Sequence, residues 1–352
     1  MARTTIAEIA QQLGVSKTTV SLALRNQPGV SEDTRQAVLE MARRMGYQPK
    51  RERARSASGP HSVLFLYTGS VDAQEGISGI GLGYLDGAQT AASDFNLQIL
   101  IDYLAEDKLV GLSAEMLSAR PGWPLGALLV GVKANDDVAI AQARQLNIPL
   151  VVVNRYWPES DLSFVSVDYT RAQARAVRYL YQLGHRKIAF VSVGSSADYC
   201  WCQQRRDGYL AGLVAEGCPS DPRFIIDAPS ATLAVQMLIQ QAPETTAICA
   251  ASDSVAIELI AELKRCGLRV PQDISIIGFD NDQRLPTPDP PLTTIDYDEV
   301  GIGYWAVRAL VEQSNSKDVQ CLHVIMTTDI VERDSCAPPR HTPFLQPDET
   351  AR

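Results

Sequence analysis

The chain has 352 residues, of which 45% are hydrophobic and 21% are charged, and its net charge is −9. This length suits two or three domains, each with its own core, and this composition is typical of a soluble globular protein. No apolar run approaches the length of a membrane span, and the first residues lack the apolar core of a signal peptide. We therefore expect a cytoplasmic protein with no membrane partner.

The charge is distributed unevenly along the chain. Residues 1–60 carry ten Lys or Arg against five Asp or Glu, a net charge of +5, so the remaining residues carry −14. A basic head on an acidic body is expected when the head binds a polyanion. The alternative is that these basic side chains only face solvent, which predicts the same exposure but no polyanionic partner.

Residues 5–26 have the pattern of two short helices joined by a sharp turn. Thr5 and Glu8 stand in capping-box spacing, and the apolar residues that follow repeat at helical period. Gly14 can take the left-handed conformation that ends the first helix, and Ser16 can cap the second. This pattern fits an ordinary antiparallel helix pair and a helix-turn-helix DNA reader about equally well.

A third helix is predicted from Ser31 to Gly46, with acidic residues in its first turn. Three short helices make a minimal domain, which Pro49 closes. Residues 50–60, KRERARSASGP, are basic and then small, as in a linker between domains.

From His61 onward, apolar runs alternate with helical patterns, which is typical of β-α units and parallel sheets. The predicted strands lie within 63–67, 97–101, 127–132, 150–153, 188–193, 224–226, 247–250, 274–279 and 322–326. The predicted helices lie near 82–94, 106–119, 135–146, 170–183, 203–216, 231–241, 253–266 and 298–314. Two doubly wound subdomains fit this pattern better than one sheet, and a closed eight-stranded barrel is the competing topology.

These segments together resemble the lactose/galactose-repressor (LacI/GalR) family of bacterial transcription regulators. The segments GVSKTTVSLAL at 14–24 and PGVSEDTRQAVLEMARRMGYQP at 28–49 are similar to its DNA-binding domain, without a gap from about Thr5 to Pro49. Its effector-binding core, which is similar to periplasmic sugar-binding proteins, is matched by PLVVVN at 149–154, YLYQLGHRKIAF at 179–190, RRDGY at 205–209, ASD at 251–253, ISIIGFDNDQ at 274–283 and PPLTTID at 290–296.

The resemblance implies a small all-α helix-turn-helix DNA-binding domain at 1–49, a hinge at 50–60 and an α/β periplasmic-binding-protein-like domain at 61–334. That domain is expected to have two Rossmann-like lobes with a ligand cleft between them. The expected bounds are about 61–162 and 294–320 for lobe 1, and about 163–293 and 321–334 for lobe 2, with chain crossings near 162–166, 290–296 and 318–323. Residues 335–352 are expected to form a disordered or loosely attached tail.

On DNA, the resemblance places Lys17, Thr18 and Leu22 at base-reading positions. Lys17 can donate to guanine, Thr18 can bond a base edge, and Leu22 offers apolar contact, with plain helix packing as its alternative role. Phosphate contacts are expected from Thr5, Ser16, Thr19, Ser21, Asn26 and Ser31. The family's hinge inserts a leucine into the minor groove, but Ser56 or Ala57 stands there in this chain. Phosphate or minor-groove contacts remain available to Lys50, Arg51, Arg53 and Arg55.

In the cleft, Arg205 matches the arginine of the family's R-x-x-G-[YF] motif, and Asp280 matches its strand-end aspartate. Both are expected to bind the effector, and the alternative is that they pair with each other or cap backbone groups. Weaker matches are Asn154 and Ser252, and the residues in loops expected to face the cleft are Asp72, Tyr84 and Trp201. The glycine-rich stretch 76–83 fails the dinucleotide fingerprint and is expected to be a flexible loop over the cleft.

No catalytic or metal-binding pattern stands out. The seven cysteines are odd in number and form no paired C-x-x-C framework, so we expect reduced, mostly buried thiols. Cys200 and Cys202 flank Trp201, but C-x-C alone is weak evidence for a redox or metal pair. The four histidines are scattered, and none lies beside an obvious nucleophile. We therefore expect no catalytic residue, no metal, no cofactor and no enzymatic activity.

The sequence thus predicts a ligand-responsive repressor of carbohydrate-metabolism genes. It is expected to bind a palindromic double-stranded operator as a homodimer or tetramer, with a sugar or sugar derivative as effector. One alternative is a non-sugar effector such as a nucleobase. The other is a sugar-binding protein without a transcriptional role, which would need an export signal and no basic head. An oxidoreductase would need an intact glycine fingerprint.

Overall fold

The structure, a computed structural model, divides the chain into two compact units, Met1–Pro60 and His61–Arg352. It describes residues 5–24, 30–45, 61–68, 79–105, 108–109, 124–132, 137–194, 199–315 and 321–339. We call the first unit the head and the second the body. The predicted hinge, residues 50–60, lies outside the described residues.

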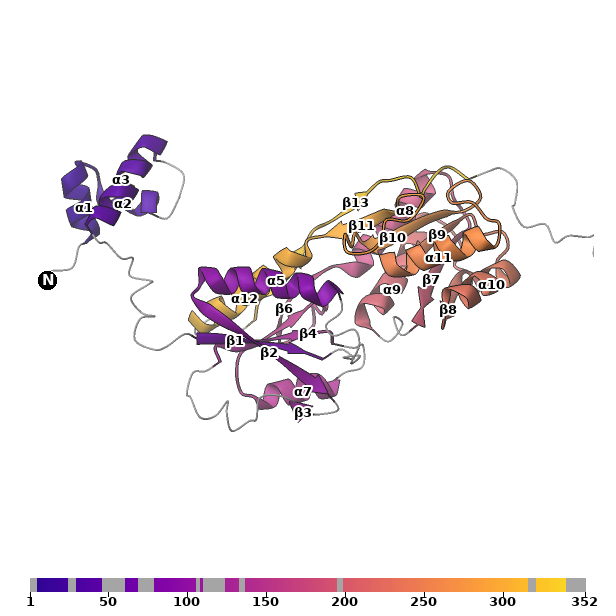
Figure 1. Cartoon of the computed structure of the whole chain (residues 1–352), viewed down its shortest axis with the longest axis horizontal. Coiled ribbons are helices and arrows are strands. Elements are labelled where there is room, and N and C mark those ends of the chain that lie inside the picture. Colours follow the sequence, from indigo (N-terminus) through magenta and orange to yellow (C-terminus); the bar gives the residue numbers. More distant parts are fainter. Residues whose placement is uncertain are drawn as a thin grey trace, which may run out of the picture. The chain divides into compact units, whose positions relative to one another are not determined.

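The head contains the three predicted helices, α1 (Ile6–Leu13), α2 (Lys17–Leu24) and α3 (Glu32–Arg44) (Figure 1). The capping box of α1 is complete, because the Thr5 backbone N–H donates to Glu8 Oε2 at 2.7 Å and the Glu8 N–H donates to Thr5 Oγ1 at 3.3 Å. Gly14 ends this helix with φ of 65°, a conformation that glycine adopts without steric cost. One fully buried side chain from each helix, Ile9, Val20 and Val38, forms the core.

The first lobe of the body is built on a seven-stranded sheet in the order β12-β6-β5-β4-β1-β2-β3. Its strands are β1 (His61–Tyr67), β2 (Leu97–Ala105), β3 (Lys108–Leu109), β4 (Gly126–Val130), β5 (Leu150–Val153), β6 (Ser163–Val167) and β12 (His323–Met326). All pairs are parallel except β2–β3. Helices α5 (Gly79–Asp94) and α12 (Glu299–Asn315) bury one face of the sheet, and α7 (Asp137–Gln145) packs on the other.

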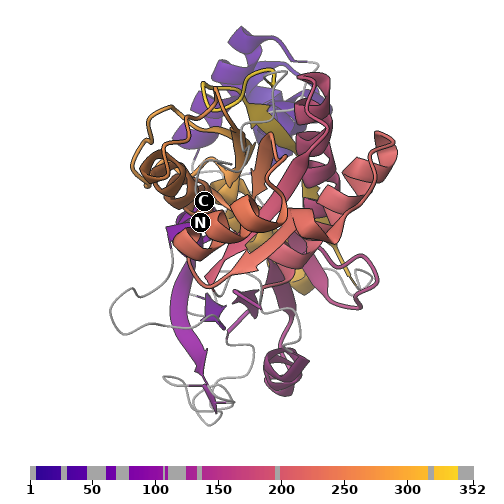
Figure 2. The ribbon, with the colours of Figure 1, turned by 90° about the vertical axis from the view of Figure 1, so that its right-hand side faces the viewer.

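The second lobe has a six-stranded sheet in the order β13-β11-β10-β9-β7-β8, in which only β13 is antiparallel. Its strands are β7 (Ile188–Val193), β8 (Ile225–Ala228), β9 (Ala247–Ala250), β10 (Ser275–Asp280), β11 (Thr293–Tyr297) and β13 (Thr328–Val331). Its helices are α8 (Tyr169–Gln182), α9 (Cys200–Ala215), α10 (Ala231–Gln241) and α11 (Asp253–Arg265), and a 3-10 turn, η2, spans Pro222–Phe224. Helices flank each sheet on both sides (Figures 1 and 2), which confirms two Rossmann-like lobes in place of a closed barrel.

The chain crosses between the lobes at Asp168, Asp298 and Thr327, a few residues later than the predicted bounds. Strand β6 pairs with β5 and β12 pairs with β6, so both belong to lobe 1, although the sequence assigns 163–167 and 323–326 to lobe 2. Strand β11 pairs with β10 and so belongs to lobe 2. From here, lobe 1 denotes 61–167, 299–315 and 323–326, and lobe 2 denotes 169–297 and 328–339.

Two further expectations are wrong, those of a disordered tail from residue 335 and of a glycine-rich loop at 76–83. The first residues of the expected tail are packed into lobe 2, where Ser335 is 0% exposed and donates through Oγ to the Ile276 carbonyl at 2.6 Å. The Ala337 carbonyl accepts from His185 Nε2 at 2.9 Å, so the chain is anchored at least to this point, while residues 340–352 lie outside the described ranges.

The glycine-rich stretch is not a loop where it is described, because helix α5 already begins at Gly79. Its glycines allow α5 to contact α12 closely. A Cβ on Gly87 would lie 1.8 Å from the Val300 carbonyl oxygen, and one on Gly303 would lie 2.0 Å from that of Tyr84. The helix expected near 106–119 is described only at Lys108–Leu109, which form strand β3.

Candidate effector site between the lobes

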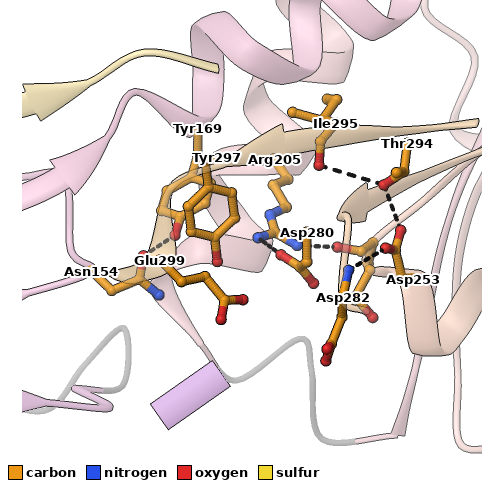
Figure 3. Close-up of polar contacts among 12 residues, drawn as sticks. Asn154, Tyr169, Arg205, Asp253, Asp280, Asp282, Thr294, Ile295, Tyr297 and Glu299 are labelled. Atoms are coloured by element: carbon orange, nitrogen blue, oxygen red, sulfur yellow. Dashed lines mark hydrogen bonds and ion pairs between the residues drawn. The ribbon is translucent and has the colours of Figure 1, made fainter. Parts of the chain in front are cut away.

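Arg205 and Asp280 form a buried ion pair in lobe 2 (Figure 3). Arg205 is 1% exposed on α9, and its Nη2 donates to Asp280 Oδ1 at 2.7 Å. Its Nη1 donates to the carbonyl of Ala251 at the end of β9, at 2.5 Å. The two residues singled out in the sequence are therefore in direct contact, and the Arg205 side chain bonds to the carboxyl ends of the neighbouring parallel strands β9 and β10, where open α/β sheets bind ligands.

Aromatic rings surround the Arg205 guanidinium. Its Cζ atom lies 3.6 Å from the ring centroid of Phe279, 4.5 Å from that of Trp201 and 4.9 Å from that of Tyr169. A planar, weakly hydrated cation is attracted to such ring faces. These contacts hold the side chain in one orientation.

Asp280 ends β10 with φ of 117°, a conformation that is strained for a residue with a side chain. Burial raises the pKa of its carboxyl, and the adjacent Arg205 guanidinium opposes that rise. Strain of this kind persists only where surrounding contacts impose it, which is common at binding sites. Here the ion pair fixes the carboxylate.

Three contacts between lobe 1 and lobe 2 lie beside this pair. The Tyr169 hydroxyl of α8 donates to Oδ1 of Asn154, which follows β5 of lobe 1. The hydroxyls of Tyr84 on α5 and Tyr297 on β11 lie 3.3 Å apart. We call these residues, together with Arg205, Asp280 and the neighbouring Asp253, Asp282, Arg284 and Glu299, the inter-lobe cluster.

The third contact is an ion pair, in which Arg284 of lobe 2 donates to Glu299 Oε2 at the start of α12 at 2.9 Å. Burial raises the pKa of Glu299 to about 7, and Arg284 opposes the rise. Burial, with Asp280 nearby, likewise raises the pKa of Asp253 to about 7. The cluster thus holds two carboxyl groups that titrate near neutral pH.

The other predicted cleft residues are placed less simply. Tyr84 is 2% exposed and lies on helix α5, not in a loop. Trp201 is half-buried on α9 and stacks on Tyr199 with the ring centroids 5.9 Å apart. Ser252 caps α11, since its Oγ accepts from the Val255 N–H at 3.3 Å. Asp72 lies outside the described residues.

The sequence did not single out Tyr169, Tyr297 or Glu299. Each lies next to a chain crossing, where a strand of one lobe ends or a helix of the other begins. Asn154 was found by its match to the family's pattern, which offers no match at Tyr169 or Tyr297. Both nonetheless lie at or just after the carboxyl end of a strand, so a search for polar residues at strand ends would find them if the strands β6 and β11 were predicted.

The cysteines of α9 are packing residues. Cys200 and Cys202 are both buried, and burial raises the pKa of the Cys202 thiol to about 11, which leaves little thiolate. Across the described ranges, no group of three or more His, Cys, Asp or Glu side chains is placed to hold a metal ion. None of the helices described is long and apolar enough to cross a bilayer.

A separate cavity of about 530 Å³ lies at the opposite edge of the second sheet, where the chain enters β10 and β11. Among its lining residues, Lys264 lies 3.6 Å from Asp289, and the Nη1 of Arg333 donates to the Leu292 carbonyl at 2.7 Å.

In the head, Lys17 is exposed at the first position of α2, and Leu22 is half-buried outside the apolar core. Thr5, Ser16 and Ser31 act as helix caps, with the Ser16 Oγ accepting from the Thr19 N–H at 3.0 Å. Thr19 is half-buried. The side chains of Thr18 and Ser21 lie outside the described part of the structure. The same is true of five whole residues, Asn26, Lys50, Arg51, Arg53 and Arg55.

Known proteins share both units. Residues 5–50 match the model for bacterial regulatory proteins of the lacI family, and residues 177–336 match that for the periplasmic binding protein-like domain.

The transcriptional repressor CytR of Escherichia coli K12 is 31% identical over 340 residues, which are 94% of this chain and 96% of CytR. The probable repressor ExuR of Bacillus subtilis 168 is 26% identical over 344 residues, 94% of this chain and 98% of ExuR. A solved LacI family regulator from Mycobacterium smegmatis has a TM-score of 0.65 at 26% identity, covering 79% of this chain and 100% of its own. The protein is 31% identical to CytR along nearly its whole length and has the helix-turn-helix head and the two-lobe body. It therefore belongs to the LacI family of bacterial transcriptional regulators.

Proposed function

We propose that this regulator is a repressor whose operator affinity is set by a small molecule bound at the inter-lobe cluster. The observation that carries the proposal is the buried Arg205–Asp280 pair, around which side chains from both lobes converge. A ligand held there touches both lobes, so it favours one lobe arrangement over the other by its differential affinity. CytR and ExuR are both named as repressors, which favours repression over activation.

The head supplies the DNA contact, with Lys17 exposed at the front of α2 to donate to a base edge. We propose Thr18 and Leu22 as its partners in reading the operator. One head makes few contacts, and a homodimer that places two heads on a palindrome makes specific affinity attainable. Such a protein acts in the cytoplasm, where the bacterial chromosome lies.

We propose no catalytic chemistry for the cluster. Asp280 is held by Arg205, and Asp253 accepts from the Thr294 hydroxyl at 2.6 Å and the Asp282 N–H at 3.0 Å, so both carboxylates serve as fixed acceptors. A solute-binding protein without a transcriptional role is disfavoured by the helix-turn-helix head, because transport has no use for a DNA-binding domain.

The test has two arms. In the first, the full chain is mixed with fragments of its own genome and the retained fragments are sequenced. A shared palindrome is expected, and Lys17→Ala should reduce its enrichment. In the second, a compound that raises the Tm of the full chain is added to the protein–operator complex, and a change of at least about tenfold in operator affinity is expected. Retention without a shared palindrome contradicts the proposal, as does a bound compound that leaves operator affinity unchanged.

A further inference from the structure

The cavity of about 530 Å³ in lobe 2 is separate from the inter-lobe cluster. Its lining residues come from helix α11, from the connection between α11 and β10, from the segment that enters β11 and from the segment that follows β13. All of them belong to lobe 2, and none belongs to the cluster. Pockets that bind small molecules commonly have volumes of about 300–1,000 Å³. The cavity is therefore large enough to hold a small molecule without any contribution from lobe 1.

One part of the lining is apolar and firmly packed. Ile260 on α11 and Leu268 after it are buried in the core of lobe 2, and Val270 packs against the same core. Pro271 and Pro290 add further apolar surface to the lining. Such a surface is suited to an aliphatic or aromatic group of a ligand, because burying that group removes apolar area from water.

Two cations of the lining have N–H groups available to a ligand. Arg269 is held in place by Asp273, which accepts from its Nε and from its Nη2, each at 2.9 Å, while its Nη1 has no partner among the described residues. Lys264 lies 3.6 Å from Asp289 in an ion pair whose side chains are 72% and 91% exposed. A pair that is so exposed contributes little to stability, so a ligand can displace it. Both cations can therefore bind a carboxylate.

The carboxylates of the lining come from two other segments. Asp334 follows β13, where its backbone N–H donates to the Pro291 carbonyl at 3.1 Å. Across the part of the chain that the structure describes, its carboxylate has no bonded partner. Asp289 lies in the segment before β11 and takes part in the exposed pair with Lys264. These two acceptors are suited to an ammonium group.

The presence of both charges restricts what the cavity can bind. The third cation, Arg333, is already engaged, since it donates to the Leu292 carbonyl and to Asn281 Oδ1, both at 2.7 Å. A purely anionic ligand would place its charge beside the two carboxylates, and a purely cationic ligand would place its charge beside the two available cations. A ligand that carries one charge of each sign can pair with both sets.

We propose that this cavity is a second ligand site, which binds a zwitterion with an apolar side chain, that is, an amino acid or a short peptide. The ligand carboxylate accepts from Lys264 and from Nη1 of Arg269, and the ligand ammonium donates to Asp334. The ligand side chain packs on Ile260 and Leu268. This site goes beyond the proposed function and does not depend on it, because the cavity and the inter-lobe cluster share no residue.

The test uses phenylalanine and matched compounds in which one charge is removed. N-acetylphenylalanine lacks the ammonium, phenylalanine amide lacks the carboxylate, and the dipeptide leucyl-phenylalanine keeps both charges. The affinity of the full chain for each compound is measured by isothermal titration calorimetry at neutral pH. Phenylalanine or the dipeptide should bind, and each blocked compound should bind at least about tenfold more weakly than phenylalanine, because it loses a hydrogen bond between charged groups. The tighter of the two zwitterions tells an amino-acid site from a peptide site.

Two variants assign the charges. Lys264→Gln should weaken zwitterion binding at least about fivefold and reduce the penalty for blocking the carboxylate, and Asp334→Asn should have the same effects for the ammonium. Arg265→Gln and Glu258→Gln are the controls, because they remove the same charges at exposed positions of α11 outside the cavity, and both should leave the affinity unchanged. Circular dichroism of all four variants establishes that the fold is kept.

The proposal is overturned if neither phenylalanine nor the dipeptide binds at millimolar concentration, if a blocked compound binds as tightly as phenylalanine, or if either cavity variant binds the zwitterion as tightly as the wild type. Operator DNA takes no part in these measurements. A negative result therefore refutes the second site alone and leaves the repressor function to its own test.

Discussion

Replacing Arg205 by methionine removes the only cation bonded to Asp280 among the residues that the structure describes. The pair is almost fully buried, with side-chain exposures of 2% and 3%. Methionine is unbranched and adaptable, so it can occupy the space between the rings of Phe279 and Trp201. The main effect of Arg205→Met is therefore electrostatic, since Asp280 is left as a buried charge without its partner.

Breaking a buried ion pair by removing one partner costs about 3–5 kcal/mol of the free energy of unfolding. Asp280→Asn should cost a similar amount, because it leaves Arg205 buried and unpaired. The double variant has neither charge, and replacing a whole buried pair is often nearly neutral. We therefore expect the double variant to be more stable than the sum of the single effects predicts, by on the order of 3 kcal/mol.

Urea unfolding of the full chain, followed by circular dichroism at pH 8, measures this coupling. Arg144→Met is the matched control, because Arg144 lies 2.5 Å from Asp161 in an ion pair whose side chains are 45% and 72% exposed, and little change in stability is expected. A coupling near zero would mean that the buried pair contributes no more than a surface pair. It would refute the view of Arg205 and Asp280 as one electrostatic unit.

Three further results are expected. Gly87→Val should lower the free energy of unfolding by about 1–3 kcal/mol in urea, because a Cβ there would lie 1.8 Å from the Val300 carbonyl oxygen. The control Gln89→Ala, at an exposed position of the same helix, should leave the free energy of unfolding unchanged. Equal effects would contradict the close contact between α5 and α12. Because burial raises the pKa of Asp253 to about 7, the contribution of this group to the free energy of unfolding should fall as pH rises from about 4 to 7. Compared with the wild type, Asp253→Asn should lose that contribution while the similar one of Glu299 stays, and an identical pH dependence in both proteins would place the titration elsewhere. Lys17→Ala should weaken operator binding by about 1–3 kcal/mol in a gel shift. The control Glu40→Gln, at an exposed position of the head, should change the affinity by no more than about twofold. Similar losses in both variants would exclude a base-specific role for Lys17.

The head was predictable because its signals are local. The capping box of Thr5 and Glu8 and the turn at Gly14 depend on residues within one helical turn of each other, and the structure contains both. The body's apolar strands were predictable for the same reason, since β1, β4 and β10 are continuous apolar or near-apolar runs.

Strands β6 and β11 were not predicted because their sequences, SFVSV and TTIDY, mix polar with apolar residues. Their burial depends on partners that are distant in sequence. Ser163 Oγ accepts from the Gln313 side chain at 2.6 Å and from the Leu322 N–H at 2.8 Å, and Thr293 Oγ1 accepts from the Arg333 N–H at 2.9 Å. No local pattern reveals that such hydroxyls are satisfied inside a sheet. The lobe crossings were misplaced by a few residues for this reason, and the cluster residues beside them were missed.

The sequence left open whether Arg205 and Asp280 bind a ligand or pair with each other, and the pairing in the structure does not by itself decide between the two. A guanidinium has five N–H donors, and the contacts to Asp280 and Ala251 use Nη2 and Nη1 while Nε stays free. A ligand can therefore bond to Arg205 without displacing Asp280, whereas an anion that competed for the guanidinium would leave Asp280 buried and unpaired, at a cost of several kcal/mol. We therefore expect the ion pair to be a preformed element of the proposed effector site.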